Sequence, residues 1–119
     1  MDTITHHLTT GTAAEISSAG TVIPNIQDGI DLMGNLYYQG FDKIIIHQAN
    51  IIPAFFDLKT GIAGEILQKF STYRVRLAIV SDFSHYQSKS LADFIYECNN
   101  GRQVNFVASV QEALDKFND

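Results

Sequence analysis

Polar side chains follow the predicted buried strands of this sequence at the places where those strands end. Residues 57–61 stand at the start of a predicted helix, and residues 81–90 follow a second apolar strand. A helix N-terminus presents free N–H groups and a partial positive charge, so a hydroxyl there can cap the helix, bind an anion or be phosphorylated. We predict an anion contact or switch made by Asp57, Lys59, Thr60 and Gly61, with simple capping as the structural alternative.

A broader ligand or partner edge is predicted from the order of elements. In open α/β sheets, ligands and partners bind beyond the carboxyl ends of the strands. Residues 88–90 repeat the pattern of a lysine between hydroxyls at a helix start, yet no G-x-x-x-x-G-K-[ST] or G-x-G-x-x-G sequence supports nucleotide binding. The residues predicted at this edge are His47, Phe56, Glu65, Ser81, Asp82, Ser88, Lys89 and Ser90.

Acid–base chemistry is a second possibility for this edge. It needs Asp57, Glu65 and Asp82 to converge within a few ångströms, which spacing alone does not establish. A solvated or helix-pairing role for Glu65 is the alternative. We predict no catalytic residue. Whether the chain is an enzyme stays open, and we favour a protein without catalytic activity.

Metal and thiol chemistry have little support. His47, His85 and Asp82 form a conceivable ligand set, but no H-E-x-x-H or paired-cysteine spacing accompanies them, so we expect no metal and no cofactor. His6 and His7 are neighbours on a predicted strand and should point to opposite faces. The single cysteine, Cys98, falls on the apolar stripe of a helix and is expected to be buried and inert.

The elements that must position these residues alternate along the chain. An opening hairpin is followed by helices and apolar strands in turn, which is typical of right-handed crossovers and a largely parallel sheet. We predict one α/β domain over residues 1–119, with a mixed, mostly parallel sheet. The expected strands cover 4–9, 12–18, 43–47, 75–80 and 104–107, with a short strand at 21–23. The expected helices cover 26–39, 58–71, 90–98 and 110–117. Gly40 is expected to end the first helix, Ser90 to cap the third, and Gly101 to end the third in a left-handed conformation.

Aromatic residues are expected mainly in the core, at Tyr37, Tyr38, Phe41, Phe55, Phe56 and Tyr73. Phe55 and Phe56 are the exception, because two adjacent side chains cannot both point inward from a regular strand. One of them is therefore predicted to form an exposed, interface-forming patch.

Composition narrows the function classes. The chain has 119 residues, 45% of them hydrophobic and only 18% charged, and a net charge of −5. There is no basic stripe for nucleic acid and no positive surface for an anionic membrane. The single cysteine and the absence of a basic, apolar leader predict a cytoplasmic protein, and the sparse charge favours a protein partner or self-association.

The sequence resembles the bacterial domain-of-unknown-function family DUF4180. The resemblance is carried by residues 53–70, by the strand 73–80, by residues 88–97, and by Phe106, Val107 and residues 112–114. It covers most of the chain and implies no established activity.

The order of elements is also similar to that of STAS domains (sulphate transporter and anti-sigma factor antagonist). That family carries an Asp-Ser-Ser/Thr-Gly-like loop before its second helix, where a kinase modifies a hydroxyl. Residues 57–61 occupy the corresponding place, with one extra residue before Thr60 and Gly61. The resemblance implies a STAS-like fold and phosphorylation of Thr60, which would reverse the potential around Lys59 and repel an acidic partner.

Three functions follow as hypotheses. The first is a small regulatory or protein-interaction module without turnover. The second is a small-molecule binder or enzyme with a concave pocket lined by Phe55, Phe56 or Tyr86, into which Asp57, His47 and Asp82 converge. The third is a homodimer whose exposed aromatic residues form the subunit contact.

Overall fold

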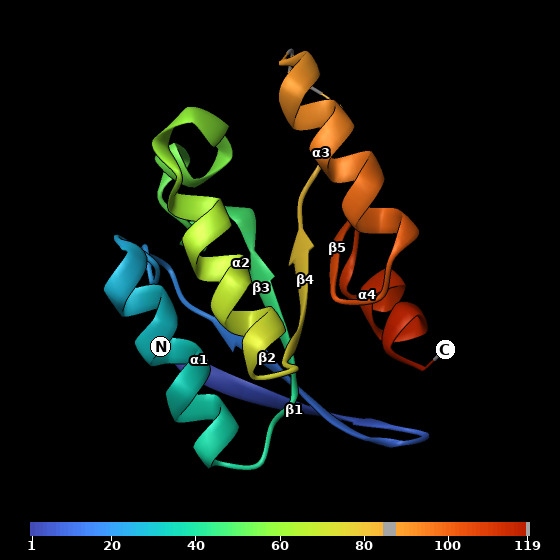
Figure 1. The fold of residues 1–119 in the computed structure, drawn as a ribbon. Coiled ribbons are helices and arrows are strands. Elements are labelled where there is room, and N and C mark those ends of the chain that lie inside the picture. The colour runs from blue at the N-terminus through green and yellow to red at the C-terminus, as the bar shows by residue number, and fades with distance from the viewer. Residues whose placement is uncertain (85–87, 119) are drawn as a thin grey trace.

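The fold, seen in a computed structural model of residues 1–119 that describes residues 1–84 and 88–118, is a five-stranded sheet with helices on both faces (Figure 1). The strand order is β1-β2-β3-β4-β5, with β1 and β2 antiparallel and every later neighbour parallel. The predicted α/β architecture, with its opening hairpin, is confirmed. In chain order the elements are β1 (Asp2–Leu8), β2 (Gly11–Ser17), α1 (Ile26–Tyr38), β3 (Lys43–His47), α2 (Ile62–Thr72), β4 (Arg76–Val80), α3 (Lys89–Asn100), β5 (Val104–Val107) and α4 (Val110–Phe117).

Two hydrophobic layers hold this sheet between its helices. Ile44 and Ile46 of β3 belong to the larger core beneath α1, α2 and α3, whereas Ile45 faces the smaller core under α4, with Ala113 and Phe117. Successive residues of a strand point to opposite faces, so a strand covered on both sides must be apolar throughout. The continuous isoleucine run of β3 meets that requirement, and it places the strand in the centre of the molecule.

Helix α1 lies close to α2 because a glycine faces the neighbouring helix. A Cβ atom on Gly29 would come within 2.9 Å of Cδ1 of Ile66 and 3.1 Å of Cγ2 of Ile23. Asn25 caps the same helix, accepting a hydrogen bond from the N–H of Asp28 at 2.8 Å, as residues with a short polar side chain commonly do. The predicted stop at Gly40 is also found, with φ at 100°.

The segment between β3 and α2 differs from the prediction. It forms three short 3₁₀ turns, Gln48–Asn50, Pro53–Phe56 and Leu58–Thr60, and α2 begins only at Ile62. The predicted start at residue 58 is wrong because Gly61 adopts the left-handed conformation, with φ at 77°, which interrupts a continuous helix. The predicted strand at 21–23 is reduced to a single bridge between Ile23 and Ile51.

The start of α3 also moves. Ser88, and not Ser90, is the N-cap, because its Oγ accepts the N–H of Leu91 at 3.2 Å. At the other end Gly101 is extended, with φ at −102°, so the expected left-handed stop is not formed there.

The prediction of which aromatic side chains are exposed is wrong for the Phe55–Phe56 pair and for three tyrosines. Phe55 and Phe56 are both buried, since a 3₁₀ turn does not send neighbouring side chains to opposite faces, and their rings meet edge to face at 5.0 Å. Tyr37, Tyr38 and Tyr73, expected in the core, are exposed by 50%, 92% and 51%. The exposed aromatic patch therefore lies at the C-terminal ends of α1 and α2.

Candidate functional site

The predicted polar edge, here called the rim, follows the carboxyl ends of β3 and β4 and continues into the start of α3, and it is defined as residues 57–61, 81–84 and 88–90. Figure 1 shows the turns before α2 and the start of α3 at the same end of the sheet. The ring of Phe56, before α2, lies 6.2 Å from the ring of Phe83, after β4, so the two loops meet. Residues 57–61 and 81–84, about twenty residues apart in the sequence, thus lie at one end of the fold.

Thr60 uses its hydroxyl within its own turn. Oγ1 lies 2.8 Å from the carbonyl oxygen of Ala54 and 2.9 Å from that of Asp57, and it accepts the N–H of Ile62 at 3.3 Å. Thr60 is nevertheless exposed at the surface. The hydroxyl therefore joins two 3₁₀ turns to the first residue of α2, whereas the N-cap position of that helix is Gly61, which has no side chain to cap it.

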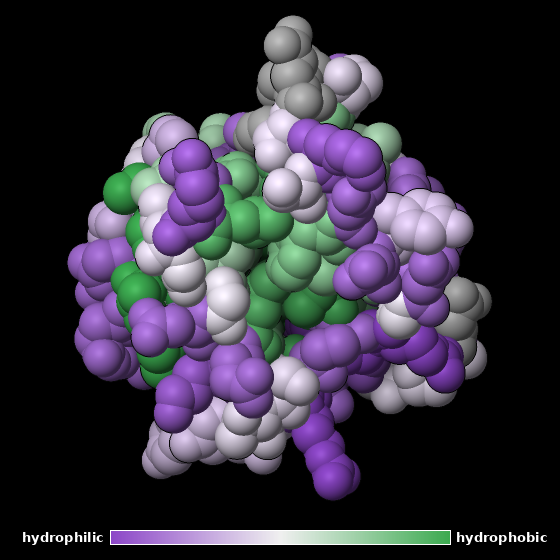
Figure 2. Space-filling model, turned by 45° about the horizontal axis from the view of Figure 1, so that its top comes forward, coloured by the Kyte–Doolittle hydropathy of each residue, from purple (hydrophilic) through white to green (hydrophobic). Residues whose placement is uncertain are grey.

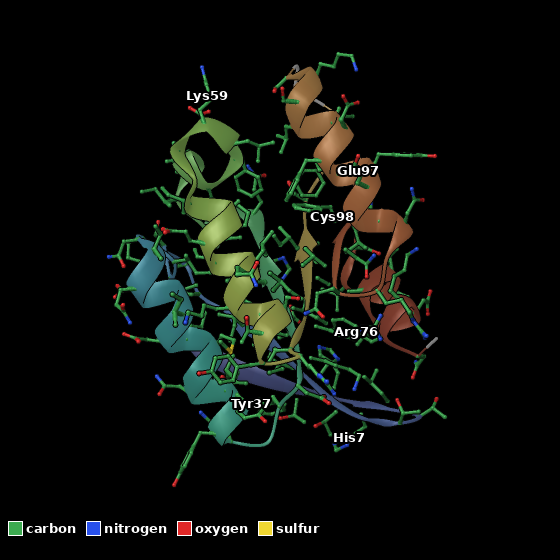
Figure 3. The ribbon with its side chains drawn as sticks, in the orientation of Figure 1. His7, Tyr37, Lys59, Arg76, Glu97 and Cys98 are labelled. Carbon is green, nitrogen blue, oxygen red and sulfur yellow. The ribbon has the colours of Figure 1, made fainter. Side chains whose placement is uncertain are left out.

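The two charged side chains of this turn, Asp57 and Lys59, point in different directions. The Asp57 carboxylate accepts the N–H of Lys59 at 3.3 Å and so closes the turn. The Lys59 side chain extends away from the fold at the tip of the loop (Figure 3). Lys59 is thus the member of the predicted anion contact that is presented outward.

The second strand-end loop is held by local hydrogen bonds. Ser81 donates to Oε1 of Gln48 at 2.5 Å, which ties the end of β4 to the turn after β3. The Asp82 carboxylate accepts both the N–H and the hydroxyl of Ser84, at 3.0 and 2.6 Å. These side chains stiffen the rim.

The start of α3 adds a second outward lysine. Lys89 pairs with Asp93 one turn later at 2.9 Å, and both side chains are largely exposed. Ser90 is exposed too, whereas Ser88 is occupied as the cap of the helix. In the predicted segment 88–90, Ser88 is therefore a structural cap, whereas Lys89 and Ser90 face the solvent.

Glu65 does not join the other two carboxylates in an acid–base group. It is exposed and borders a surface hollow between α1 and α2, together with Ile26, Ile30, Gly64 and Lys69. The other two carboxylates are engaged in their own turns, as described above. His85 and Tyr86, predicted as a possible metal ligand and a pocket wall, lie outside the described residues.

A histidine–glutamate cluster that sequence reasoning missed lies on the α4 side of the sheet. Nε2 of His6 is 2.7 Å from one oxygen of Glu15, and Nε2 of His47 is 2.8 Å from the other. A carboxylate only accepts hydrogen bonds, so both histidines donate from Nε2. Among the residues that the structure describes, no group of His, Cys, Asp and Glu side chains is suited to hold a metal ion.

The charge state of Glu15 follows from these contacts. Burial by itself would raise the pKa of this carboxyl, but the hydrogen bonds from His47 and His6, with their positive charge, outweigh it and leave the pKa below its ordinary value. One signal in the sequence could have found this cluster, since Glu15 is the only charged residue in the otherwise apolar run from Ala13 to Ile16.

Asn50, in the turn after β3, is a buried structural residue. It is 3% exposed, and its side-chain amide donates to the carbonyl oxygens of Ser18 and Gly20 at 2.9 and 2.7 Å. Its backbone carbonyl accepts the N–H groups of Val22 and Ile23. Asn50 therefore fixes the loop from β2 into α1.

An apolar groove runs between α2 and α3. Its volume is about 420 Å³, and hydrophobic side chains lie in the hollow that opens in Figure 2. Its apolar lining is made by Leu67, Phe94, Cys98 and Val104, and its polar borders by Gln68, Ser71, Glu97 and Arg102. An apolar centre with a polar border is typical of a protein-binding surface.

Cys98 is half-buried in the wall of this groove, next to Glu97 (Figure 3). Burial raises the pKa of the Cys98 thiol, and the negative charge of Glu97 raises it further. A thiol that stays protonated is a poor nucleophile. Cys98 therefore contributes apolar surface to the groove.

Comparison with known proteins gives a family and no closer relative. The family model described as Domain of unknown function (DUF4180) matches residues 9–117. No curated protein and no solved structure matches. None of the helices in the described part of the chain has the length and apolar character needed to cross a membrane.

Proposed function

Since the chain belongs to the DUF4180 family, a domain family of unknown function, we propose from its geometry that it is a non-catalytic, regulatory protein-interaction module. Its binding surface is the α2–α3 groove together with the rim beside it. The single observation that carries this proposal is the apolar groove with polar borders. A cytoplasmic location and the STAS-like mode of action are part of the proposal.

The state of the rim side chains supports binding over catalysis. A catalytic hydroxyl or carboxylate must be free to meet a substrate and to exchange a proton. Thr60, Asp82 and Ser88 instead hold backbone groups or neighbouring side chains at hydrogen-bond distance. A rim of this kind has a fixed shape, which favours recognition of a second surface.

The proposed occupant of the groove is an apolar-anchored segment of a partner protein. The groove offers Leu67 and Phe94 to such anchors, and Lys59 at the rim adds an outward positive charge. A partner with apolar anchors and an acidic flank fits both features. Small-molecule binding is less well supported, because Phe55 and Phe56, the expected pocket walls, are packed in the core.

Two glycines provide a matched experiment. A Cβ atom on Gly64, at the groove, would meet nothing within 4 Å, and neither would one on Gly34, on α1. Both positions therefore have room for a Cβ atom, but only Gly64 borders the α2–α3 groove, so Gly64→Arg places a long charged side chain at its edge. The partner is first captured from the native cells by wild type, then purified, and its binding to each variant is measured by calorimetry.

We expect Gly64→Arg to weaken binding at least about tenfold, a loss of roughly 1.4 kcal/mol. Gly34→Arg should bind as wild type does, and Lys59→Glu should weaken binding more at low salt than at high salt. A partner that binds Gly64→Arg as tightly as wild type would contradict the proposed surface. A substrate turned over by the purified chain would contradict the non-catalytic role.

A further inference from the structure

Strand β1 leaves one edge of the sheet open. It is the terminal strand, seven residues long, and it pairs with β2 along its whole length from Asp2↔Ser17 to Leu8↔Gly11. The opposite edge, β5, has only four residues, all of them buried, and packs against both α3 and α4. In the described part of the chain, β1 is therefore the long strand with an unpaired side.

The register decides which backbone groups face that open side. Leu8 and Gly11 close a two-residue turn, so they form a hydrogen-bonded pair, and pairing then alternates along the hairpin. The even-numbered residues of β1 bond to β2. The N–H and C=O groups of Thr3, Thr5 and His7 consequently point away from the sheet.

Apart from Asp2 at its first position, β1 carries none of the features that usually protect an edge strand against pairing. Natural edge strands are usually blocked by proline, lysine, a bulge or short length. Between Thr3 and Leu8 there is no proline, lysine or acidic residue, and the register is regular throughout. Ile4 is 43% exposed on this strand, and the hairpin projects beyond the neighbouring strands in Figure 1.

We propose that β1 pairs with β1 of a second copy of this chain, antiparallel, about a two-fold axis at Thr5. This is the register that pairs the whole strand with itself: Thr5 faces Thr5 of the other copy, and Thr3 faces its His7. Both backbone groups of Thr3, Thr5 and His7 then find partners. On the α4 face, the exposed Ile4 lies against His6 of the other copy, and no like charges oppose each other between residues 3 and 7.

The two sheets join into one continuous sheet across this axis, so the dimer is isologous and closed. The α2–α3 groove is on other elements, and the proposal is therefore independent of the proposed function. The exposed tyrosines Tyr37, Tyr38 and Tyr73 are the competing surface for self-association. The following measurements distinguish the two surfaces.

Register is tested by cross-linking in a Cys98→Ser background. Cα atoms of a hydrogen-bonded antiparallel pair lie about 5.5 Å apart, within the range that a disulfide spans. Thr5→Cys should oxidise to a covalent dimer in high yield, whereas Thr3→Cys alone should not. Mixing Thr3→Cys with His7→Cys should restore cross-linking. Equal yields for Thr5→Cys and Thr3→Cys alone would overturn the proposed axis.

The edge itself is tested by proline substitution. Thr5→Pro removes an N–H that points outward, so the hairpin keeps its own hydrogen bonds. Light scattering on wild type should give twice the chain mass, and Thr5→Pro should halve it while circular dichroism stays unchanged. A second test uses lysine, which leaves the backbone N–H in place. Thr5→Lys changes the proposed axis, and Thr10→Lys, in the turn of the hairpin, is its control.

Thr5→Lys places two lysines opposite each other and should give a monomer, and Thr10→Lys should remain dimeric. Mixing the Thr5→Glu protein with the Thr5→Lys protein should restore the dimeric mass, because a glutamate then lies opposite a lysine. A monomeric wild type at all concentrations would overturn the proposal. A dimer that persists in Thr5→Pro and Thr5→Lys but is lost in Tyr38→Glu would overturn it in favour of the tyrosine surface.

Discussion

Nε2 of His47, at the end of β3, lies 2.8 Å from Oε2 of Glu15 in the middle of β2. The other carboxylate oxygen is held by His6 of β1, so one side chain joins three strands. The Glu15 side chain is only 13% exposed. A partly buried carboxylate with two hydrogen-bond donors stabilises the folded state as long as it stays ionised.

The first prediction concerns the pH dependence of this cluster. The folded state holds the pKa of Glu15 below its ordinary value of 4.5, so the stabilisation is present above that pH and is lost as pH falls through the folded pKa. At neutral pH, Glu15→Gln should lower the free energy of unfolding by about 1–2 kcal/mol, because an amide cannot accept from both histidines. Urea unfolding at several pH values measures both effects.

The difference between wild type and Glu15→Gln should shrink as the solution is acidified below 4.5. Glu65→Gln serves as the control, since Glu65 is exposed on α2 and should leave the unfolding free energy nearly unchanged. A gap between wild type and Glu15→Gln that stays constant on acidification would show that the carboxylate charge is not what stabilises the cluster.

The second prediction compares two glycines of α1. Gly29→Ala places a methyl group 2.9 Å from Ile66, so the contact between α1 and α2 must open, at a cost of about 1–3 kcal/mol. Gly34→Ala meets nothing within 4 Å and should stabilise the helix by about 0.5–1 kcal/mol. Thermal unfolding of both variants should show shifts of opposite sign, and equal shifts would contradict the packing argument.

The strands and most helices were predictable because their signals are local and repeated. The strands 43–47 and 104–107 are found with the predicted bounds, since strands made mainly of apolar residues suit positions that are covered on both faces. The segment from 48 to 61 was not predictable in detail. Its turns depend on distant contacts, such as Asn50 with Ser18, which no local pattern records.

The sequence order predicted how the rim segments are arranged, but not which contacts their side chains make. The sequence order placed residues 57–61 and 88–90 at one end of the sheet, and the fold has them there. Which side chains are free depends on hydrogen bonds that form only in three dimensions, such as that between Thr60 and Ala54. The Glu15 cluster needs three strands in register, so its residues look unrelated in the sequence.

The third prediction concerns the cap of α3. Ser88→Ala removes the oxygen that accepts the N–H of Leu91 and should cost about 1 kcal/mol of unfolding free energy. Ser90→Ala changes an exposed residue inside the first turn and should be neutral or slightly stabilising, because alanine favours helix. Urea unfolding separates the two variants. A larger loss for Ser90→Ala than for Ser88→Ala would restore Ser90 as the cap.

The fourth prediction separates the structural role of Thr60 from its proposed part in binding. Thr60→Val keeps the shape of the side chain but loses the hydroxyl that contacts Ala54, Asp57 and Ile62. Because the site is exposed and water can replace part of these bonds, the loss should be about 1 kcal/mol. Thr60→Ser keeps the hydroxyl and should unfold close to wild type.

Partner binding then decides what else the hydroxyl does. If Thr60 acts as a switch, Thr60→Glu should bind the partner more weakly than Thr60→Val, although both lose the same turn contacts, because only glutamate adds negative charge beside Lys59. Calorimetry on folded samples of both variants, at low and high salt, measures the difference. Equal affinities for Thr60→Glu and Thr60→Val would limit Thr60 to holding the turn before α2.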